Sequence, residues 1–287
     1  MKPSRFRYHR PKDLADAVAL LSDLGDDAKL LAGGQSLVPM MNLRLARPEH
    51  LVDAGRIDSL RGVEESSGGV TIGAMTTQRQ IERSELISRR FPVLAEAVRH
   101  IAHPPIRVRG TIGGSLAHAD PAAELPAIAT LLDAEITATG PRGERVIPAG
   151  DFFLGFLTTS LEPDEVLTSV RLPKWPDGAG WAFEEISRRH GDFALAGVAA
   201  LVRRRNGSVE SARIALFGVG ATPIRAVEAE HLAAGRPSTP ETWQELARAA
   251  TERLDPPADV HSTAAYRKRV AAVLVSRALA TAFERSR

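Results

Sequence analysis

The stretch "LLAGGQSLVPMMNLRLARPEHLVD", Leu30 to Asp53, decides how this chain begins to fold, because two adjacent glycines follow a short apolar run. A glycine pair adds no side chain to a core and costs chain entropy, so it marks backbone that needs an unusual conformation or lies close to something. The run from Lys29 to Ala32 predicts a strand that ends at Gly33-Gly34. The pattern recurs in "TIGGS", Thr111 to Ser115, so two glycine loops need one explanation.

Glycine loops of this kind suit phosphate oxygens. Successive backbone N–H groups in such a turn form a concave nest with partial positive charge, and a neighbouring hydroxyl adds a donor. Neither loop has the Gly-x-x-x-x-Gly-Lys-Ser/Thr order of a P-loop or the Gly-x-Gly-x-x-Gly spacing of a nucleotide-binding βαβ unit. The pair predicts a ligand with two linked phosphates, held from both sides. The competing interpretation is that each loop is merely a tight turn.

Composition narrows the class of protein. The chain has 287 residues, a length typical of about two domains. Lys and Arg number 37 against 35 Asp and Glu, and the basic residues are scattered, which argues against nucleic acid as a partner. Cysteine is absent, so this chain can hold no Cys-ligated iron–sulfur cluster, Cys-ligated zinc or disulfide. Without a secretory signal or an apolar window of membrane-spanning length, we expect a cytoplasmic protein.

Helix and strand patterns alternate in the first part of the chain, which indicates an α+β fold. They predict helices over 13–25, 76–87 and 91–102, strands over 68–75 and 165–173, and a hairpin around 141–144. A further helix is expected from Asp120-Pro121, with Pro126 either kinking it or delaying its true start. The Pro- and Gly-rich "KWPDGAG" marks the expected boundary between a domain 1–176, with subdomains of about 1–55 and 56–176, and a domain 177–287.

The last third of the chain is predicted to form an antiparallel sheet with helices packed against it. Strands are expected over 180–189, 193–205 and 211–220, the last two joined by a hairpin turn at Asn206-Gly207. Three amphipathic helices are expected to follow, over 224–235, 239–254 and 263–287.

Three segments together carry a family resemblance. "KLLAGGQSLVPMMNLRLARPEHLVD", "IRVRGTIGGSLAHADPAAELPA" and "RRHGDFALAGVAA" closely resemble the FAD-binding medium subunit of molybdenum hydroxylases, the group of aerobic carbon monoxide dehydrogenase and the flavin part of xanthine dehydrogenase. The resemblance covers the whole chain. It implies a two-part FAD-binding domain of the vanillyl-alcohol oxidase type, followed by a small C-terminal domain with a three-stranded antiparallel sheet and helices.

The same resemblance implies which residues hold FAD. The first pyrophosphate loop would consist of Lys29, Leu30, Leu31, Ala32, Gly33, Gly34, Gln35 and Ser36. The second would consist of Thr111, Gly113, Gly114 and Ser115. Ile101, with Ala102 beside it, matches a position near the flavin, and Leu167 matches an apolar contact beside the isoalloxazine. Glu124 matches an acid that hydrogen-bonds cofactor hydroxyls, and Asp120 lies near enough in sequence to assist. No catalytic residue and no metal ligand is expected.

The sequence departs from the family pattern in two places. Many relatives have a lysine that reaches the flavin where this chain has Glu184-Glu185, and we expect both carboxylates to point elsewhere or to pair with Arg188 or Arg189. Phe193 replaces a tyrosine that some relatives place by the flavin, which keeps the aromatic surface and loses the hydroxyl.

Four histidines call for an interpretation. His100 and His103 are spaced like a metal pair, but no third ligand follows, so we expect a helix end with solvated rings. His118 and His190 adjoin the recognised loops and either contact the cofactor or cap a turn.

The resemblance implies an electron outlet for chemistry done elsewhere. A large molybdopterin subunit would hydroxylate the substrate, a small subunit with two [2Fe-2S] clusters would relay electrons, and FAD on this chain would pass them to an external acceptor. The expected assembly is a dimer of heterotrimers. Two alternatives remain open, a self-contained FAD-dependent oxidase and a cofactor-free scaffold or assembly protein.

Overall fold

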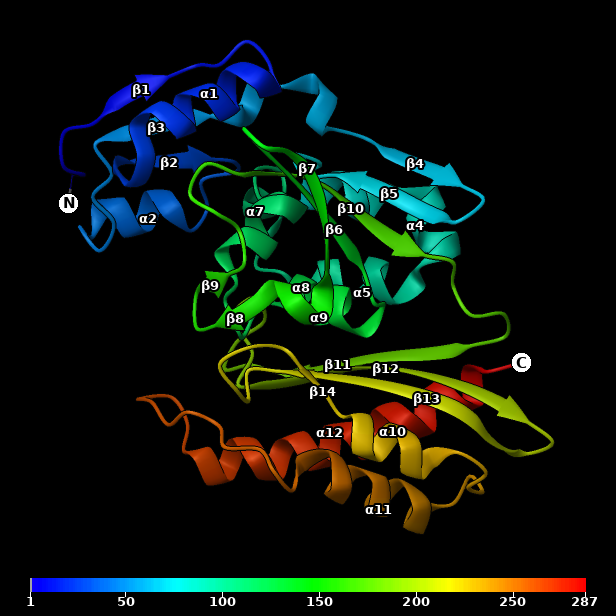
Figure 1. The fold of residues 1–287 in the computed structure, drawn as a ribbon. Coiled ribbons are helices and arrows are strands. Elements are labelled where there is room, and N and C mark those ends of the chain that lie inside the picture. Colours follow the sequence, from blue (N-terminus) through cyan, green and yellow to red (C-terminus); the bar gives the residue numbers. More distant parts are fainter. Residues whose placement is uncertain (1) are drawn as a thin grey trace.

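The chain is built around three main sheets. The structure is a computed structural model that describes residues 2–287. In Figure 1 a three-stranded sheet lies at the top, a five-stranded sheet in the middle and a four-stranded sheet at the bottom, with helices between and below them. The α+β class expected from the sequence is confirmed.

The N-terminal sheet is parallel, with strand order β1-β3-β2. Its elements are β1 (Arg7–His9), α1 (Leu14–Leu24), β2 (Ala28–Leu31), α2 (Leu37–Asn42) and β3 (His50–Asp53), with short 3-10 turns at Gly25–Asp27, Ala54–Arg56 and Asp58–Leu60. The Asp13 carboxylate caps α1 by accepting from the N–H of Asp16, and Gly25 ends that helix with φ +55°. The glycine pair follows β2 after one residue, Ala32, close to where the sequence predicts the strand to end.

The central sheet is antiparallel, in the order β4-β5-β10-β6-β7. Its strands are β4 (Val63–Ser66), β5 (Gly69–Gly73), β6 (Glu135–Gly140), β7 (Gly143–Pro148) and β10 (Val166–Pro173). The accompanying elements are α3 (Gln78–Arg83), α4 (Glu85–Arg90), α5 (Pro92–His100), α6 (Pro104–Arg107), α7 (Ile112–His118), α8 (Glu124–Leu131), α9 (Ala149–Phe152), β8 (Phe153–Gly155) and β9 (Thr158–Thr159).

Two predicted helices in this region have different bounds. The helix expected over 76–87 is two helices, because Ser84 leaves the helical conformation with ψ 114° and its hydroxyl caps α4 by accepting from the N–H of Ile87. The helix expected from Asp120 begins at Glu124. The Asp120 carboxylate accepts from the N–H of Ala122, 2.9 Å away, and so closes a turn before the helix.

The C-terminal sheet is antiparallel, in the order β11-β12-β13-β14. The three expected strands are β11 (Gly180–Ile186), β12 (Ala196–Arg205) and β13 (Ser208–Phe217), followed by α10 (Val227–Ala233), α11 (Pro240–Thr251) and α12 (Ala264–Arg285). A short fourth strand, β14 (Ile224–Arg225), pairs with β13 and takes the place of the first turn of the helix expected over 224–235.

The C-terminal sheet is apolar on both faces, because its alternate residues enter different cores. Phe183, Leu201 and Phe217 pack with α5 and α8 in the core of the central region, whereas Val198 and Leu216 pack under α10 to α12. The sheet thus lies between the central helices and the C-terminal helices, as Figure 1 shows. The domain bounds drawn at residues 55 and 176 stay a prediction.

Candidate functional site at two glycine loops

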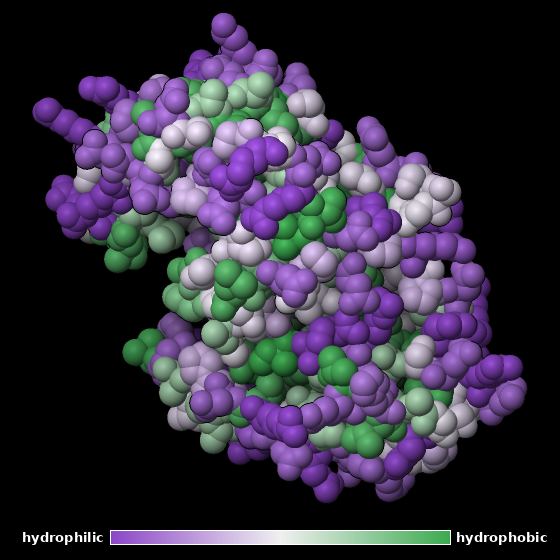
Figure 2. Space-filling model, in the orientation of Figure 1, coloured by the Kyte–Doolittle hydropathy of each residue, from purple (hydrophilic) through white to green (hydrophobic). Residues whose placement is uncertain are grey.

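The first glycine loop lines a groove of about 380 Å³. Leu31, Gly33, Gly34 and Gln35 form one wall, and three residues of α2 together with Arg109 complete the lining; the α2 residues are Val38, Pro39 and Asn42. In the orientation of Figure 1, Figure 2 shows the surface indented below α2, with apolar side chains along its edges. The groove is therefore open to solvent on the side of the molecule where α2 lies.

The backbone N–H groups of this first loop are free to bind a ligand. Within residues 2–287, no protein acceptor takes the N–H of Gly33, Gly34, Gln35 or Ser36. Gly34 has φ +71°, in the left-handed region that glycine favours, and the amide of Gln35 folds back to donate to the carbonyl of Gly33, 3.0 Å away. Consecutive free donors beside a left-handed glycine make a concave anion nest.

The second glycine loop has the opposite arrangement, because its N–H groups are already bonded within the protein. Gly113 N–H donates to the carbonyl of Ala74 at 2.9 Å, and Gly114 N–H donates to the Thr111 hydroxyl at 3.0 Å. The N–H groups of Ile112 and Ser115 donate to the carbonyls of Thr76 and Thr111. The expectation that this loop offers a nest of free donors is therefore wrong. The polar group that this loop can present to a ligand is the hydroxyl of Ser115.

Glycine is needed in both loops so that they can touch. A Cβ added at Gly33 would lie 2.2 Å from the carbonyl oxygen of Arg109, and one at Gly114 would lie 3.3 Å from Cβ of Ala32. A Cβ at Gly113 would lie 2.6 Å from Cβ of Ala74. The two loops are thus neighbours in space, as the prediction of one ligand held from both sides requires.

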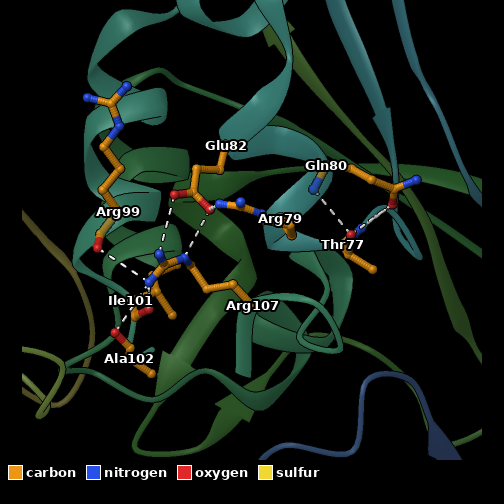
Figure 3. A network of polar contacts seen from close by, with 8 residues as sticks. All are labelled: Thr77, Arg79, Gln80, Glu82, Arg99, Ile101, Ala102 and Arg107. Carbon is orange, nitrogen blue, oxygen red and sulfur yellow. Dashed lines mark hydrogen bonds and ion pairs between the residues drawn. The ribbon is translucent and has the colours of Figure 1, made fainter. Parts of the chain in front are cut away.

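The turn at Ile101 and Ala102 is fixed by one buried cation. Arg107 donates from Nη1 to the carbonyls of Ile101 at 2.8 Å and Ala102 at 3.3 Å, while its Nε and Nη2 pair with Glu82 at 3.2 and 3.3 Å (Figure 3). Ala102 has φ +41°, a left-handed conformation that a residue with a side chain rarely adopts. Arg107 thus holds this turn in a strained shape, and Arg79 adds a second contact to Glu82.

Leu167 is joined to the second loop through the central sheet. It lies buried in β10 at an irregularity of the pairing with β6, and the next residue, Thr168, accepts from the N–H of Ala74. The carbonyl of Ala74 in turn accepts from Gly113. Lys29, by contrast, is exposed on β2 and does not line the groove, and neither do Ile101, Glu124 and Leu167.

Glu124 lies in the protein interior at the first turn of α8, where it is 5% exposed. Burial, reinforced by the negative charge of Glu185, raises the pKa of Glu124 to about 8. Glu185 in turn lies 3.4 Å from Nδ1 of His100, and this contact raises the pKa of His100. Glu124 therefore holds a proton at neutral pH.

Of the two outcomes expected for Glu185, pairing with Arg188 or Arg189 is not the one found within residues 2–287, because Glu185 contacts His100. Alternation along β11 turns Glu185 toward α5, whereas Arg188 contacts His261. His100 ends α5 as expected, but its ring contacts two carboxylates instead of being merely solvated.

The other residues singled out by the sequence lie in loops around this region. The rings of His103 and His190 stack with centroids 6.3 Å apart, and Phe193 is 59% exposed. His118 ends α7, and Asp120 closes the turn before α8.

Sequence reasoning missed Arg107 and Arg109. Arg109 lies two residues before Thr111, the first residue of the second loop. This position was the sequence feature that could have indicated that Arg109 lies near the groove. For Arg107 no local signal exists, because its partner Glu82 comes from a different helix.

Comparison with known proteins assigns the chain to a family. The family model described as the FAD binding domain in molybdopterin dehydrogenase matches residues 4–175, and that of the CO dehydrogenase flavoprotein C-terminal domain matches residues 181–282. The chain is 45% identical over 285 residues to the carbon monoxide dehydrogenase medium chain of Hydrogenophaga pseudoflava, which covers 99% of each chain.

A second relative and a solved structure support the same family assignment. The 6-hydroxypseudooxynicotine dehydrogenase complex subunit alpha of Paenarthrobacter nicotinovorans is 44% identical over 288 residues, covering 100% of this chain and 97% of that one. The fold matches a carbon monoxide dehydrogenase structure from Hydrogenophaga pseudoflava with a TM-score of 0.98, 46% identity and 100% of both chains covered. The chain belongs to the family of FAD-binding medium subunits of molybdopterin dehydrogenases; it is an oxidoreductase subunit, and its cofactor is FAD.

Proposed function

We propose that this chain is the electron outlet of a molybdenum hydroxylase, with the FAD pyrophosphate bound at the first glycine loop. The observation that carries the proposal is the row of free N–H donors from Gly33 to Ser36 beside the groove. Arg109 lines the same groove and supplies a cation for the phosphate charges. The residues present therefore fit an extended dinucleotide.

The remaining site residues have supporting roles in this proposal. The second loop forms a tightly packed wall against the first and offers the Ser115 hydroxyl. The turn at Ile101 and Ala102 and the apolar Leu167 would border the flavin. A protonated Glu124 both donates and accepts hydrogen bonds, which suits cofactor hydroxyls. The further residues assigned to FAD are Lys29, Leu30, Leu31, Ala32, Thr111, Gly113, Gly114 and Asp120.

Flavin, when bound, exchanges electrons singly or in pairs, so it can join one-electron donors to two-electron acceptors. In this proposal electrons come from [2Fe-2S] clusters of a small partner subunit, and a large molybdopterin subunit carries out the hydroxylation, within a cytoplasmic dimer of heterotrimers. No helix within residues 2–287 has the length and apolar character needed to span a membrane. The FAD-binding domain would comprise residues 1–176 and the C-terminal domain residues 177–287.

Exposed apolar side chains support the presence of partner subunits. Leu43 and Leu45 follow α2, and Leu154 and Phe156 lie in and beside β8; all four are more than half exposed. Where such side chains gather into one contiguous patch, they mark a surface that another protein covers.

Purification of the chain from its native host, with whatever accompanies it, tests the proposal. We expect a flavin absorption spectrum, FAD released on denaturation, a large and a small partner, and no reduction of the flavin by substrate on the isolated chain. Reduction of the isolated chain by substrate would instead identify a self-contained oxidase. A colourless protein that refuses added FAD would identify a scaffold.

A further inference from the structure

One short segment connects the strained turn to the groove. Residues 101–110 run from the turn at Ile101 and Ala102, through α6, to Arg109, whose side chain lines the groove. Hydrogen bonds between near neighbours stiffen the segment, among them the one from the N–H of Arg109 to the carbonyl of Ile106 at 3.0 Å. A shift of α6 is therefore passed on to Arg109.

The first glycine loop rests directly on the far end of this 101–110 segment. A Cβ added at Gly33 would lie 2.2 Å from the carbonyl oxygen of Arg109 and 2.9 Å from Cα of Gly110. The backbone of the loop thus packs against the backbone of the segment without a side chain between them. Where the 101–110 segment lies therefore decides how Arg109 and the donors of the loop are placed relative to each other.

Helix α3 holds the 101–110 segment at two points. Its first residue, Gln78, donates its N–H to the carbonyl of Gly110 at 2.8 Å. One turn further along, Glu82 accepts from Nε and Nη2 of Arg107 at 3.2 and 3.3 Å. Arg107 also donates from Nη1 to the two carbonyls of the turn at 101–102, at 2.8 and 3.3 Å, and Figure 3 shows its guanidinium between Glu82 and these carbonyls.

The pair of Glu82 and Arg107 is buried and charged. Their side chains are 13% and 7% exposed. Burial by itself would raise the pKa of Glu82, but hydrogen bonds from Arg79 and Arg107 lower that pKa below its ordinary value, so the carboxylate stays ionised at neutral pH. The pair also sustains the backbone of Ala102 at φ +41°, because such a conformation persists only where its surroundings over-determine it.

We propose that Arg107, anchored by Glu82, is a positioning residue for FAD. It sets the 101–110 segment so that Arg109 and the donors of the first loop meet the FAD pyrophosphate together. The proposal rests on the function proposed above, because that function places the pyrophosphate at this loop. Arg107 acts on FAD only through the segment that carries Arg109.

Amide hydrogen exchange of the full chain without FAD tests the hold on the segment. Arg107→Lys keeps the charge, but one ammonium group cannot replace the planar fork that joins Glu82 to two carbonyls. Peptides covering residues 101–110 should exchange about tenfold faster than in wild type, as expected when hydrogen bonds to a charged group are lost. Peptides of the β12–β13 hairpin should keep their rate. Unchanged exchange of residues 101–110 in both Arg107→Lys and Arg107→Gln would overturn the proposal.

Fluorescence titration of FAD tests the positioning. We expect Arg107→Lys to bind FAD about tenfold more weakly, because the groove loses its preorganised geometry. Arg109→Gln should weaken binding about tenfold in wild type and less than about threefold in Arg107→Lys, since residues that act through one another are not additive. If Arg109→Gln has the same effect in both backgrounds, Arg107 does not act through Arg109 and the proposal fails.

Arg225→Lys is the matched control for a general loss of stability. Arg225 forms the same kind of fork with Glu230, with two bonds of 2.8 Å, and donates to the carbonyl of Thr130 at 3.1 Å. It lies in β14 and does not line the groove. Arg225→Lys should therefore bind FAD like wild type and leave the effect of Arg109→Gln intact. A loss of affinity equal to that of Arg107→Lys would attribute both losses to destabilisation and overturn the positioning role.

The two proposals fail in different ways. A wild-type chain that refuses FAD, while Arg107→Lys still exchanges faster over residues 101–110, loses the function proposed above and keeps the hold of α3 on the segment. A chain that binds FAD equally well as wild type and as Arg107→Lys keeps that function and loses the positioning role of Arg107.

Discussion

The two glycine loops have nearly the same sequence and differ in what their backbone does. In the loop from Gly33 to Ser36 the N–H groups have no acceptor among residues 2–287, whereas in the loop from Thr111 to Ser115 the carbonyls of Ala74, Thr76 and Thr111 and one threonine hydroxyl take them. The first loop offers donors to a ligand, and the second allows close approach of neighbouring backbone. A glycine pair therefore identifies a crowded place, and only the hydrogen bonds around it distinguish a binding loop from a packing loop.

The largest effect should come from Gly33→Ala, which tests whether the first loop is the binding loop. Its Cβ would collide with the backbone carbonyl of Arg109 at 2.2 Å, so the loop must shift and its donors lose their alignment. We expect the dissociation constant for FAD to rise by about 100-fold or more, roughly 3 kcal/mol. Flavin fluorescence titration measures it. Gly150→Ala, which adds a Cβ to open space, should bind FAD like wild type.

Gly113→Ala tests whether the second loop is a packing loop. The new Cβ would overlap Ala74, so we expect the free energy of unfolding of the apo protein to fall by roughly 2 kcal/mol, as for other overpacked sites. Urea denaturation measures this loss. A loss of FAD affinity as large as that of Gly33→Ala, with unfolding unchanged, would contradict the division of roles between the loops.

Arg109→Gln separates the charge of the groove from its backbone donors. Because Arg109 lines the groove beside the first loop and carries a positive charge, we expect FAD to bind about tenfold more weakly, about 1.4 kcal/mol. The variant should also show a weaker dependence of affinity on salt. Arg89→Gln removes the same charge from α4, and calorimetry of the two variants should show an effect for Arg109 alone.

The smallest expected effect is that of Thr111→Ala. The hydroxyl of Thr111 caps α7 through the N–H of Gly114, so its removal should reduce the free energy of unfolding by about 1 kcal/mol. Thr111→Ser keeps the cap and should remain close to wild type. If denaturation midpoints of all three proteins coincide, the bonded state of the second loop is not what stabilises it.

Local patterns were enough to predict much of the fold. The β12–β13 hairpin turns at Asn206-Gly207, whose φ values of +52° and +79° are those that a tight two-residue turn demands, and this pair was readable from the sequence. The helix break at Ser84 was not, because a serine can also sit on an exposed helix surface. Only the hydroxyl bond to Ile87 makes it a cap.

For the candidate site, the sequence indicated which residues form the two loops, but it did not indicate which distant residues contact them. The family resemblance supplied the residues of both loops, but the contact of Gly33 with Arg109 depends on how the first sheet docks on the central one. The Glu185–His100 contact likewise joins β11 to α5, which no local pattern relates. The N–H groups of the second loop looked free in sequence because their acceptors at Ala74 and Thr76 come from a distant turn.

The sheet β11 to β13 has apolar side chains on both faces, which limits where the chain can be cut into fragments that fold on their own. Leu125 and Ile128 of α8 share one core with Phe183 and Phe217, which lie beyond the expected boundary at residue 176. A fragment 1–176 would expose the apolar surface that this sheet covers. We therefore expect the fragment to aggregate, as light scattering would show. The shared core thus ties the folding of residues 1–176 to the presence of residues 177–287.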